Sequence, residues 1–198
     1  MKFIFDLDGT ITAQETLPLI AKHFQVQEEI SELTKETIHG NIPFVESFIR
    51  RVHILGKLPV TEISDLLEKV VLHRKILEFI NKNQEDCIIA TGNLDCWIEK
   101  LAIKIGCSYY TSEAVVQNNN VSSITHILKK EVIVKKYQDQ GEKVVYIGDG
   151  NNDMEAMRIA DIAIATGLTH NPANSILPFS DYLIFSEKAL CRQLNQLF

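Results

Sequence analysis

The sequence predicts an α/β protein, with a doubly wound parallel sheet that has helices on both faces and a small helical bundle inserted after the first strand. Short apolar runs recur along the chain without alternating with polar residues, which is typical of strands covered on both faces. Helical patterns separate the later runs, as strand–helix–strand units require. Between residues 12 and 72, the apolar spacing is helical.

The elements follow from these patterns in chain order. The five expected strands are KFIF (2–5), CIIA (87–90), VVYI (144–147), DIAIA (161–165) and DYLIF (181–185). The helices expected between and after them span 94–106, 129–141, 152–160 and 187–198. Ser186 is a suitable N-cap for the last helix, and Asn118, Asn119 and Asn120 predict a polar turn.

The helical insertion divides the chain into two expected domains. Its four helical segments lie at 15–24, 26–40, 43–55 and 61–71. We therefore expect a core domain formed by residues 1–11 and 73–198, and a cap domain formed by residues 12–72.

The composition limits the class of partner. The chain has 198 residues, 20 of them Lys or Arg and 26 Asp or Glu, so its net charge is −6. This charge disfavours nucleic acid or an anionic membrane as the main partner. No stretch approaches the roughly 20 apolar residues of a membrane span, and no apolar signal segment precedes Asp6. The four cysteines lack CxxC or zinc spacing. We expect a cytoplasmic protein with reduced thiols.

Two pairs of aspartates follow two of the expected strands. Asp6 and Asp8 lie in DLDGT after the first strand, and Asp149 and Asp153 lie in GDGNND after the strand at 144–147. The carboxyl ends of parallel strands meet at one edge of the sheet, where ligands of open α/β sheets bind. We therefore expect the four carboxylates to lie close together.

Such a cluster needs a cation. Two carboxylates about 4 Å apart repel by about 4 kcal/mol at an effective dielectric constant of 20. Oxygen ligands without histidine or thiolate favour Mg²⁺ over zinc. A Mg²⁺ ion that keeps part of its shell for water and phosphate suits phosphoryl transfer.

Two further segments offer groups for a phosphate. Thr91 follows the strand at 87–90 and directly precedes the next expected helix. Its hydroxyl and the amides of Gly92 and Asn93 would face an oxyanion at the helix N-terminus, although Thr91 would serve equally as a helix cap. The run ILKKEVIVKKY also offers one lysine to neutralise the phosphate.

Taken in order, these motifs resemble the haloacid dehalogenase superfamily of aspartate-nucleophile phosphatases. The resemblance implies a Rossmann-like core with a cap and an aspartyl-phosphate formed on Asp6. It implies that Asp8 is the general acid and base. It also implies that Asp6, the Asp8 carbonyl and Asp149 bind Mg²⁺, with Asp153 supporting the metal through water.

The same resemblance assigns the phosphate-binding residues. They would be Thr91, Gly92, Asn152 and a lysine at the start of the helix before the last motif. Lys130 occupies that position, with Lys129 left open as the alternative.

The insertion resembles the cap of the phosphoserine phosphatase-like branch. AQETL places Glu15, and FVESFIRRV places Arg51, where that branch binds an ammonium and a carboxylate. TGNL departs from its usual Ser-Gly-Gly-Phe, because Asn93 and Leu94 replace the second glycine and the aromatic residue.

The resemblance implies a Mg²⁺-dependent phosphomonoesterase acting on phosphoserine or a similar small phosphorylated metabolite. A phosphotransferase, or a phosphatase for another small metabolite, remains the alternative. A less favoured one is a phospho-accepting signalling protein. The sequence leaves the oligomeric state open.

Overall fold

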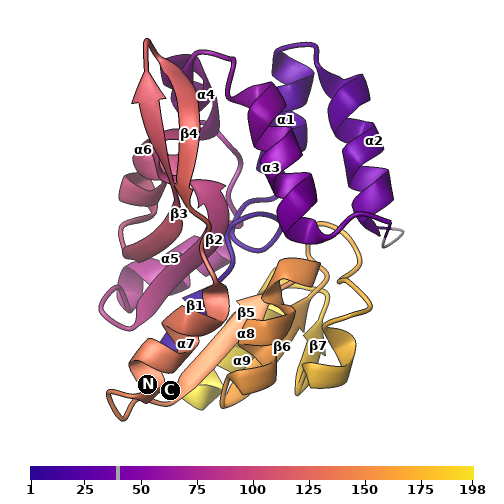
Figure 1. Cartoon of the computed structure of the whole chain (residues 1–198). Coiled ribbons are helices and arrows are strands. Elements are labelled where there is room, and N and C mark those ends of the chain that lie inside the picture. The colour runs from indigo at the N-terminus through magenta and orange to yellow at the C-terminus, as the bar shows by residue number, and fades with distance from the viewer. Residues whose placement is uncertain (39–40) are drawn as a thin grey trace.

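The computed structural model describes residues 1–38 and 41–198. Within these residues, seven strands form one sheet in the order β4-β3-β2-β1-β5-β6-β7 (Figure 1). All neighbouring strands are parallel except the antiparallel pair β3 and β4. The strands are β1 Lys2–Phe5, β2 Cys87–Leu94, β3 Ser108–Gln117, β4 Asn120–His126, β5 Val144–Gly148, β6 Ile162–Thr166 and β7 Tyr182–Ile184.

The five expected strands are present, and the hairpin β3–β4 adds two that were not predicted. Asn118 and Asn119 join its strands with φ values of +51° and +64°. Two successive positive φ values are the geometry of a type I′ turn, which Asn tolerates better than most residues. The polar turn is therefore a hairpin turn. Its flanking strands escaped prediction because they are largely exposed and so lack a continuous apolar run.

The helices in the described residues agree with the expected ones, with one addition, α5. They are α1 Thr16–His23, α2 Gln27–Ile38, α3 Phe44–Leu55, α4 Val60–Leu67, α5 Arg74–Lys82, α6 Asp95–Ile105, α7 Lys130–Gln138, α8 Met154–Ile159 and α9 Glu187–Leu197. The end of the expected helix at 26–40 lies outside the described residues. Ser186 accepts a hydrogen bond from the amide of Ala189 and caps α9 as predicted.

Helices cover both faces of the sheet. Phe3 and Phe5 of β1 belong to the apolar cluster that includes residues of α5, α6 and α9. Ile4 belongs to the cluster on the other face, with residues of α7 and α8. The central strand is thus buried on both sides, as its unbroken apolar sequence predicts.

The helical insertion leaves and re-enters the sheet domain at adjacent points. Thr12 and Leu72 form an antiparallel bridge, and the amide of Ala13 donates to the carbonyl of Val71 at 2.8 Å. These crossings coincide with the expected boundaries at 12 and 72, while the division into two domains stays a prediction. Helices α1–α3 lie beyond the carboxyl ends of the strands (Figure 1). No helix in the described part of the chain is long and apolar enough to span a membrane.

Candidate active site

The first acidic pair lies on a tight turn directly after β1. Asp6 is only 4% exposed, and Leu7 donates its amide to Asp6 Oδ1 at 2.8 Å. Gly9 has φ +72°, and a Cβ atom built there would lie 2.6 Å from Asp149 Oδ2. Only glycine allows both this conformation and this close approach. The turn therefore brings the two acidic motifs together.

Asp153 organises the second acidic motif. Its Oδ2 accepts from the amides of Asp149 at 3.0 Å and Gly150 at 2.9 Å. Its Oδ1 accepts from Lys130 Nζ at 2.6 Å and from the hydroxyl of Tyr146 at 2.7 Å. Asp153 is fully buried, and these four hydrogen bonds fix the loop after β5. The sequence did not single out Tyr146, which lies inside a strand.

Lys130, rather than Lys129, faces the carboxylates. Its Nζ lies 2.7 Å from Asp6 Oδ1, and its side chain is 2% exposed, whereas Lys129 is exposed. Burial opposes the charge of Lys130, but Asp153 and Asp6 together outweigh burial and hold its pKa above the ordinary value. Lys130 is therefore a buried ammonium that joins Asp6 to Asp153.

The carboxylates carry more negative charge than this lysine neutralises. Burial, and then the charge of Asp153, raise the pKa of Asp6 well above its ordinary value against the opposing effect of Lys130. Burial also raises the pKa of Asp149, against the hydrogen bond from His170. Raised carboxyl pKa values mean that the ionised cluster is electrostatically unfavourable without a further cation.

The same cluster fits a divalent metal. Single carboxylate oxygens of Asp6, Asp149 and Asp153 all lie within 4.8 Å of one another. This donor set consists of oxygen atoms, which hard cations prefer. The geometry and the charge deficit therefore both suit a divalent cation at this edge of the sheet.

Asp8 lies between the core and the insertion. Its Oδ1 accepts from the amide of Thr16 at 3.0 Å, at the start of α1. Its Oδ2 lies 3.5 Å from Thr91 Oγ1 and 3.4 Å from Asn93 Nδ2. Burial, and then the charge of Glu15, raise the pKa of Asp8 to about 6. A carboxyl group with this pKa can both donate and accept a proton near neutral pH.

The surroundings of Thr91 correct one expectation. No helix begins directly after Thr91, because β2 continues to Leu94 and α6 begins at Asp95. The pairing of β2 with β3 shifts register between Ala90 and Leu94. Thr91 and the next two residues therefore lie on an irregular stretch of strand instead of at the start of a helix. The amide of Asn93 donates to Thr91 Oγ1 at 3.1 Å.

A cavity of about 600 Å³ opens above this sheet edge. It is bounded by the turn after β1, the loop after β5, the loop after β6, and helices α1 to α3. The predicted site residues that line it are Asp6, Asp8, Glu15, Arg51, Gly92, Asp149 and Asn152. Thr91, Lys130 and Asp153 are buried next to these residues. The structure thus brings all the predicted site residues to one place.

Arg51 reaches the cavity from α3. Its Nε donates to the carbonyl of Ser47 at 3.3 Å. Burial lowers the pKa of Arg51, and the carboxylates of Glu15 and Asp8 act in the opposite direction. The guanidinium therefore lies within electrostatic reach of both acids.

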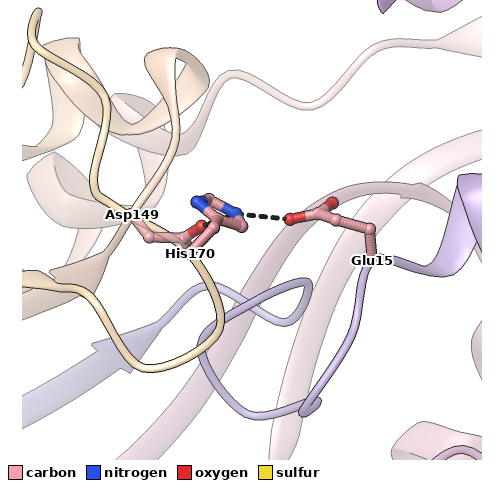
Figure 2. Close-up of side chains that lie close together, drawn as sticks. All are labelled: Glu15, Asp149 and His170. Atoms are coloured by element: carbon pink, nitrogen blue, oxygen red, sulfur yellow. Dashed lines mark hydrogen bonds and ion pairs between the residues drawn. The ribbon is translucent and has the colours of Figure 1, made fainter. Parts of the chain in front are cut away.

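His170 is a site residue that the sequence analysis missed. Its Nε2 lies 2.8 Å from Glu15 Oε1 and 3.0 Å from Asp149 Oδ2, between the insertion and the sheet domain (Figure 2). The hydrogen bonds to Asp149 and then Glu15 raise the pKa of His170 to about 11. The available signal was its position, because the loop after β6 reaches the same sheet edge as the aspartates.

The sequence matches the family model of haloacid dehalogenase-like hydrolases over residues 3–158. It is 26% identical over 176 residues to the phosphoserine phosphatase of Methanocaldococcus jannaschii, an alignment that covers 82% of this chain and 83% of that protein. It is 25% identical over 175 residues to the phosphoserine phosphatase of Lactococcus lactis, covering 82% of this chain and 81% of that protein.

Solved structures confirm the predicted fold class. A phospho-aspartyl intermediate analogue of phosphoserine phosphatase superposes with a TM-score of 0.80 at 22% identity, covering 99% of this chain and 97% of that one. A phosphoserine phosphohydrolase-like protein from Francisella tularensis superposes with a TM-score of 0.81 at 19% identity, covering 98% of this chain and all of that one (100%).

Proposed function

Because the chain belongs to the haloacid dehalogenase-like hydrolases and is a phosphatase, we propose that it hydrolyses small phosphate monoesters through an aspartyl-phosphate on Asp6, with phosphoserine as the first candidate substrate. The observation that carries the proposal is the buried Asp6 at the cavity, with Lys130 Nζ 2.7 Å from one of its oxygens. A second acid, Asp8, follows two residues later and lines the same cavity.

Asp6 is the proposed nucleophile. The hydrogen bonds found for it in the described residues, from the amide of Leu7 and from Lys130, both involve Oδ1. Oδ2 is therefore the oxygen that would attack phosphorus. Lys130 and Thr91 would bind the phosphoryl oxygens, with Gly92 and Asn152 beside them. Mg²⁺ held by Asp6, the Asp8 carbonyl and Asp149, with Asp153 behind them, would neutralise the charge of the transferring phosphoryl group.

Asp8 is the proposed general acid and base. It would give a proton to the leaving alkoxide as the P–O bond breaks, and would then take a proton from the water that hydrolyses the aspartyl-phosphate. Its pKa of about 6 supports this double role, because neither protonation state is strongly disfavoured near neutral pH.

Glu15 and Arg51 support an amino-acid substrate. They line the same cavity, carry opposite charges and would bind an ammonium and a carboxylate. Glu15 already accepts a hydrogen bond from His170, so a substrate ammonium would share or replace that contact. The two relatives compared above are phosphoserine phosphatases, which supports the same choice.

Release of inorganic phosphate tests the chemistry. A panel of phosphorylated metabolites and p-nitrophenyl phosphate should be turned over with Mg²⁺ and not with EDTA, and Zn²⁺ should substitute poorly. Asp6→Asn should abolish turnover, because an amide cannot form the acyl-phosphate. Asp139→Asn, which changes an exposed aspartate at the end of α7, is the matched control and should retain activity. Substantial steady-state turnover by Asp6→Asn would refute the covalent route.

Substitution of Arg51 tests the substrate. A bidentate Arg–carboxylate contact is poorly reproduced by Lys, so Arg51→Lys should lower kcat/KM for phosphoserine by about tenfold or more and change p-nitrophenyl phosphate hydrolysis far less. Arg50→Lys is the matched control, because Arg50 is exposed and pairs with Glu46. If the wild type hydrolyses phosphoserine no faster than glycerol phosphate, the amino-acid substrate is wrong while phosphatase chemistry stands.

A further inference from the structure

The side chain of Asn93 lies at the junction of the sheet domain and the insertion. It is 4% exposed and comes from the irregular part of β2. Its Nδ2 donates to Thr16 Oγ1 at 2.6 Å and lies 3.4 Å from Asp8 Oδ2. Thr16 is fully buried and is the first residue of α1. Asn93 therefore makes a long contact with Asp8, the proposed acid and base, and a short hydrogen bond with Thr16.

The backbone fixes the orientation of the Asn93 amide. The amide nitrogen of Leu94 donates to Asn93 Oδ1 at 3.0 Å, and a backbone N–H can only donate. The NH₂ group must therefore face Thr16 and Asp8. Thr16 Oγ1 accepts from this NH₂ group, and the backbone amide of Thr16 donates to Asp8 Oδ1 at 3.0 Å. Asn93 is thereby linked to Asp8 in two ways, through its own contact at 3.4 Å and through Thr16.

We propose that Asn93 is a positioning residue for Asp8, acting through its hydrogen bond to Thr16. By donating to Thr16 Oγ1, Asn93 fixes the first residue of α1. The backbone amide of Thr16 in turn holds the carboxyl group of Asp8 at 3.0 Å, and Asn93 Nδ2 lies 3.4 Å from the other oxygen of that group. Together these contacts keep Asp8 facing the leaving-group oxygen. This inference rests on the proposed function, because it requires Asp8 to transfer a proton to that oxygen.

The dependence of the hydrolysis rate on the leaving group distinguishes a positioning role of Asn93 from a general structural one. An alkoxide needs a proton as it departs, whereas p-nitrophenolate departs without one. Misplacement of Asp8 should therefore slow the hydrolysis of alkyl phosphates more than that of p-nitrophenyl phosphate. kcat/KM is the informative quantity, because it covers the steps up to departure of the leaving group and excludes the later hydrolysis of the aspartyl-phosphate.

The experiment compares kcat/KM for p-nitrophenyl phosphate with kcat/KM for the alkyl phosphate that the wild type hydrolyses fastest. Asn93→Ala and Thr16→Val should each lower the alkyl ester value by about tenfold or more and the p-nitrophenyl value by less than about threefold. Thr16→Ser keeps the hydroxyl and should retain the wild-type ratio. Ser112→Ala is the control for loss of a buried polar group, since Ser112 contacts the amide of Leu128 instead of Asp8.

Equal losses on both esters in Asn93→Ala and Thr16→Val would overturn the proposal, as would a ratio in Thr16→Ser that matches Thr16→Val. Circular dichroism and thermal unfolding check the fold of each variant. If Asn93→Ala does not fold, the near-isosteric Thr16→Val and its partner Thr16→Ser decide the question. A wild type that hydrolyses neither ester would refute the proposed function instead, so the two failures are distinguishable.

Discussion

At the scale of single residues, the hydrogen bonds of His170 determine its protonation state. Its Nδ1 lies 2.9 Å from the carbonyl oxygen of Asn171, so this nitrogen must donate. Its Nε2 faces one carboxylate oxygen each of Glu15 and Asp149, so it must donate as well (Figure 2). A neutral imidazole has only one N–H. In the metal-free protein, His170 is therefore an imidazolium ion that separates two carboxylates.

This charge should make stability depend on pH. The pKa of His170 is raised to about 11 in the folded protein, against about 6.5 when unfolded. The stabilisation is thus complete below about pH 6.5 and is lost as the pH rises towards 11. In EDTA, the unfolding temperature of the wild type should fall over this interval more steeply than that of His170→Gln. His126→Gln, at an exposed site on β4, should retain the wild-type slope. Parallel curves for wild type and His170→Gln would contradict the assignment.

The residues that could be predicted differ from the others in where their partners lie. Asp6, Asp149 and Lys130 were predictable because they occupy recognisable positions at strand ends or at a helix start, and the ends of parallel strands meet. Asn93 and His170 each take one partner from the insertion. Sequence gives no distance between the insertion and the sheet, so their contacts with Thr16 and Glu15 could not be foreseen.

At the scale of elements, the tip of the β3–β4 hairpin caps helix α4. The carbonyl of Asn119 accepts from the amide of Val60 at 2.7 Å, and its Oδ1 accepts from the amide of Thr61 at 3.1 Å. Both amides belong to the first turn of α4, which has no partners for them within the helix. Pro59, the residue at the N-cap position, makes no side-chain cap. The hairpin therefore supplies the hydrogen-bond acceptors that the residues just before α4 do not provide.

Asn119→Ala should consequently weaken the protein. Loss of a side-chain cap costs about 1 kcal/mol, which for this chain length lowers the unfolding temperature by about 2–4 °C. Asn118→Ala is the matched control. Asn118 has a similar positive φ, but among the described residues no hydrogen bond joins its side chain to α4. Urea denaturation should show a larger loss for Asn119→Ala than for Asn118→Ala. Equal losses would mean that turn strain alone is responsible.

The two strands of the hairpin also show which kind of strand could not be predicted from the sequence. The strands buried on both faces were found because their apolar runs are continuous, as in VVYI of β5. β3 and β4 lie at one side of the sheet, and much of their surface is exposed, so polar residues interrupt their apolar ones. Strand pairing stabilises them, and pairing depends on neighbours distant in sequence. Helix α5 was missed in the stretch between the insertion and β2.

At the scale of the whole molecule, the four inserted helices are attached to the sheet domain unequally. Helix α4 is tied to α6, since Asp65 pairs with Lys100 and the carbonyl of Glu68 accepts from Lys104 Nζ at 2.7 Å. It is also tied to the hairpin through Asn119. Helices α1–α3 pack on one another beyond the sheet edge that carries the aspartates (Figure 1), and the hydrogen bonds of Glu15 and Thr16 join them to the sheet domain at the start of α1. We infer that α1–α3 move over the cavity, while α4 stays with the sheet.

Hydrogen exchange tests this division. Beryllofluoride with Mg²⁺ mimics a phosphorylated aspartate, and closure over it should slow amide exchange in α1–α3 while leaving α4 unchanged. Beryllofluoride without Mg²⁺ is the control and should change neither group. Equal slowing in α4 would show that residues 12–72 move as one body. Unchanged exchange throughout would show that the cavity does not close.

The position of β1 in the sheet has a consequence for biosynthesis. Phe3 pairs with Cys87 on one side and with Val145 on the other, so the strand of this sheet that is synthesised before the others described lies at its centre. At a synthesis rate of about 5–20 residues per second, roughly 7–30 s separate the appearance of β1 from that of β5. Until β5 is available, the side of β1 that will pair with it stays open, and the apolar run from Phe3 to Phe5 is a risk for aggregation. The aspartate that follows β1 thus reaches its final surroundings only after roughly 140 further residues have been translated.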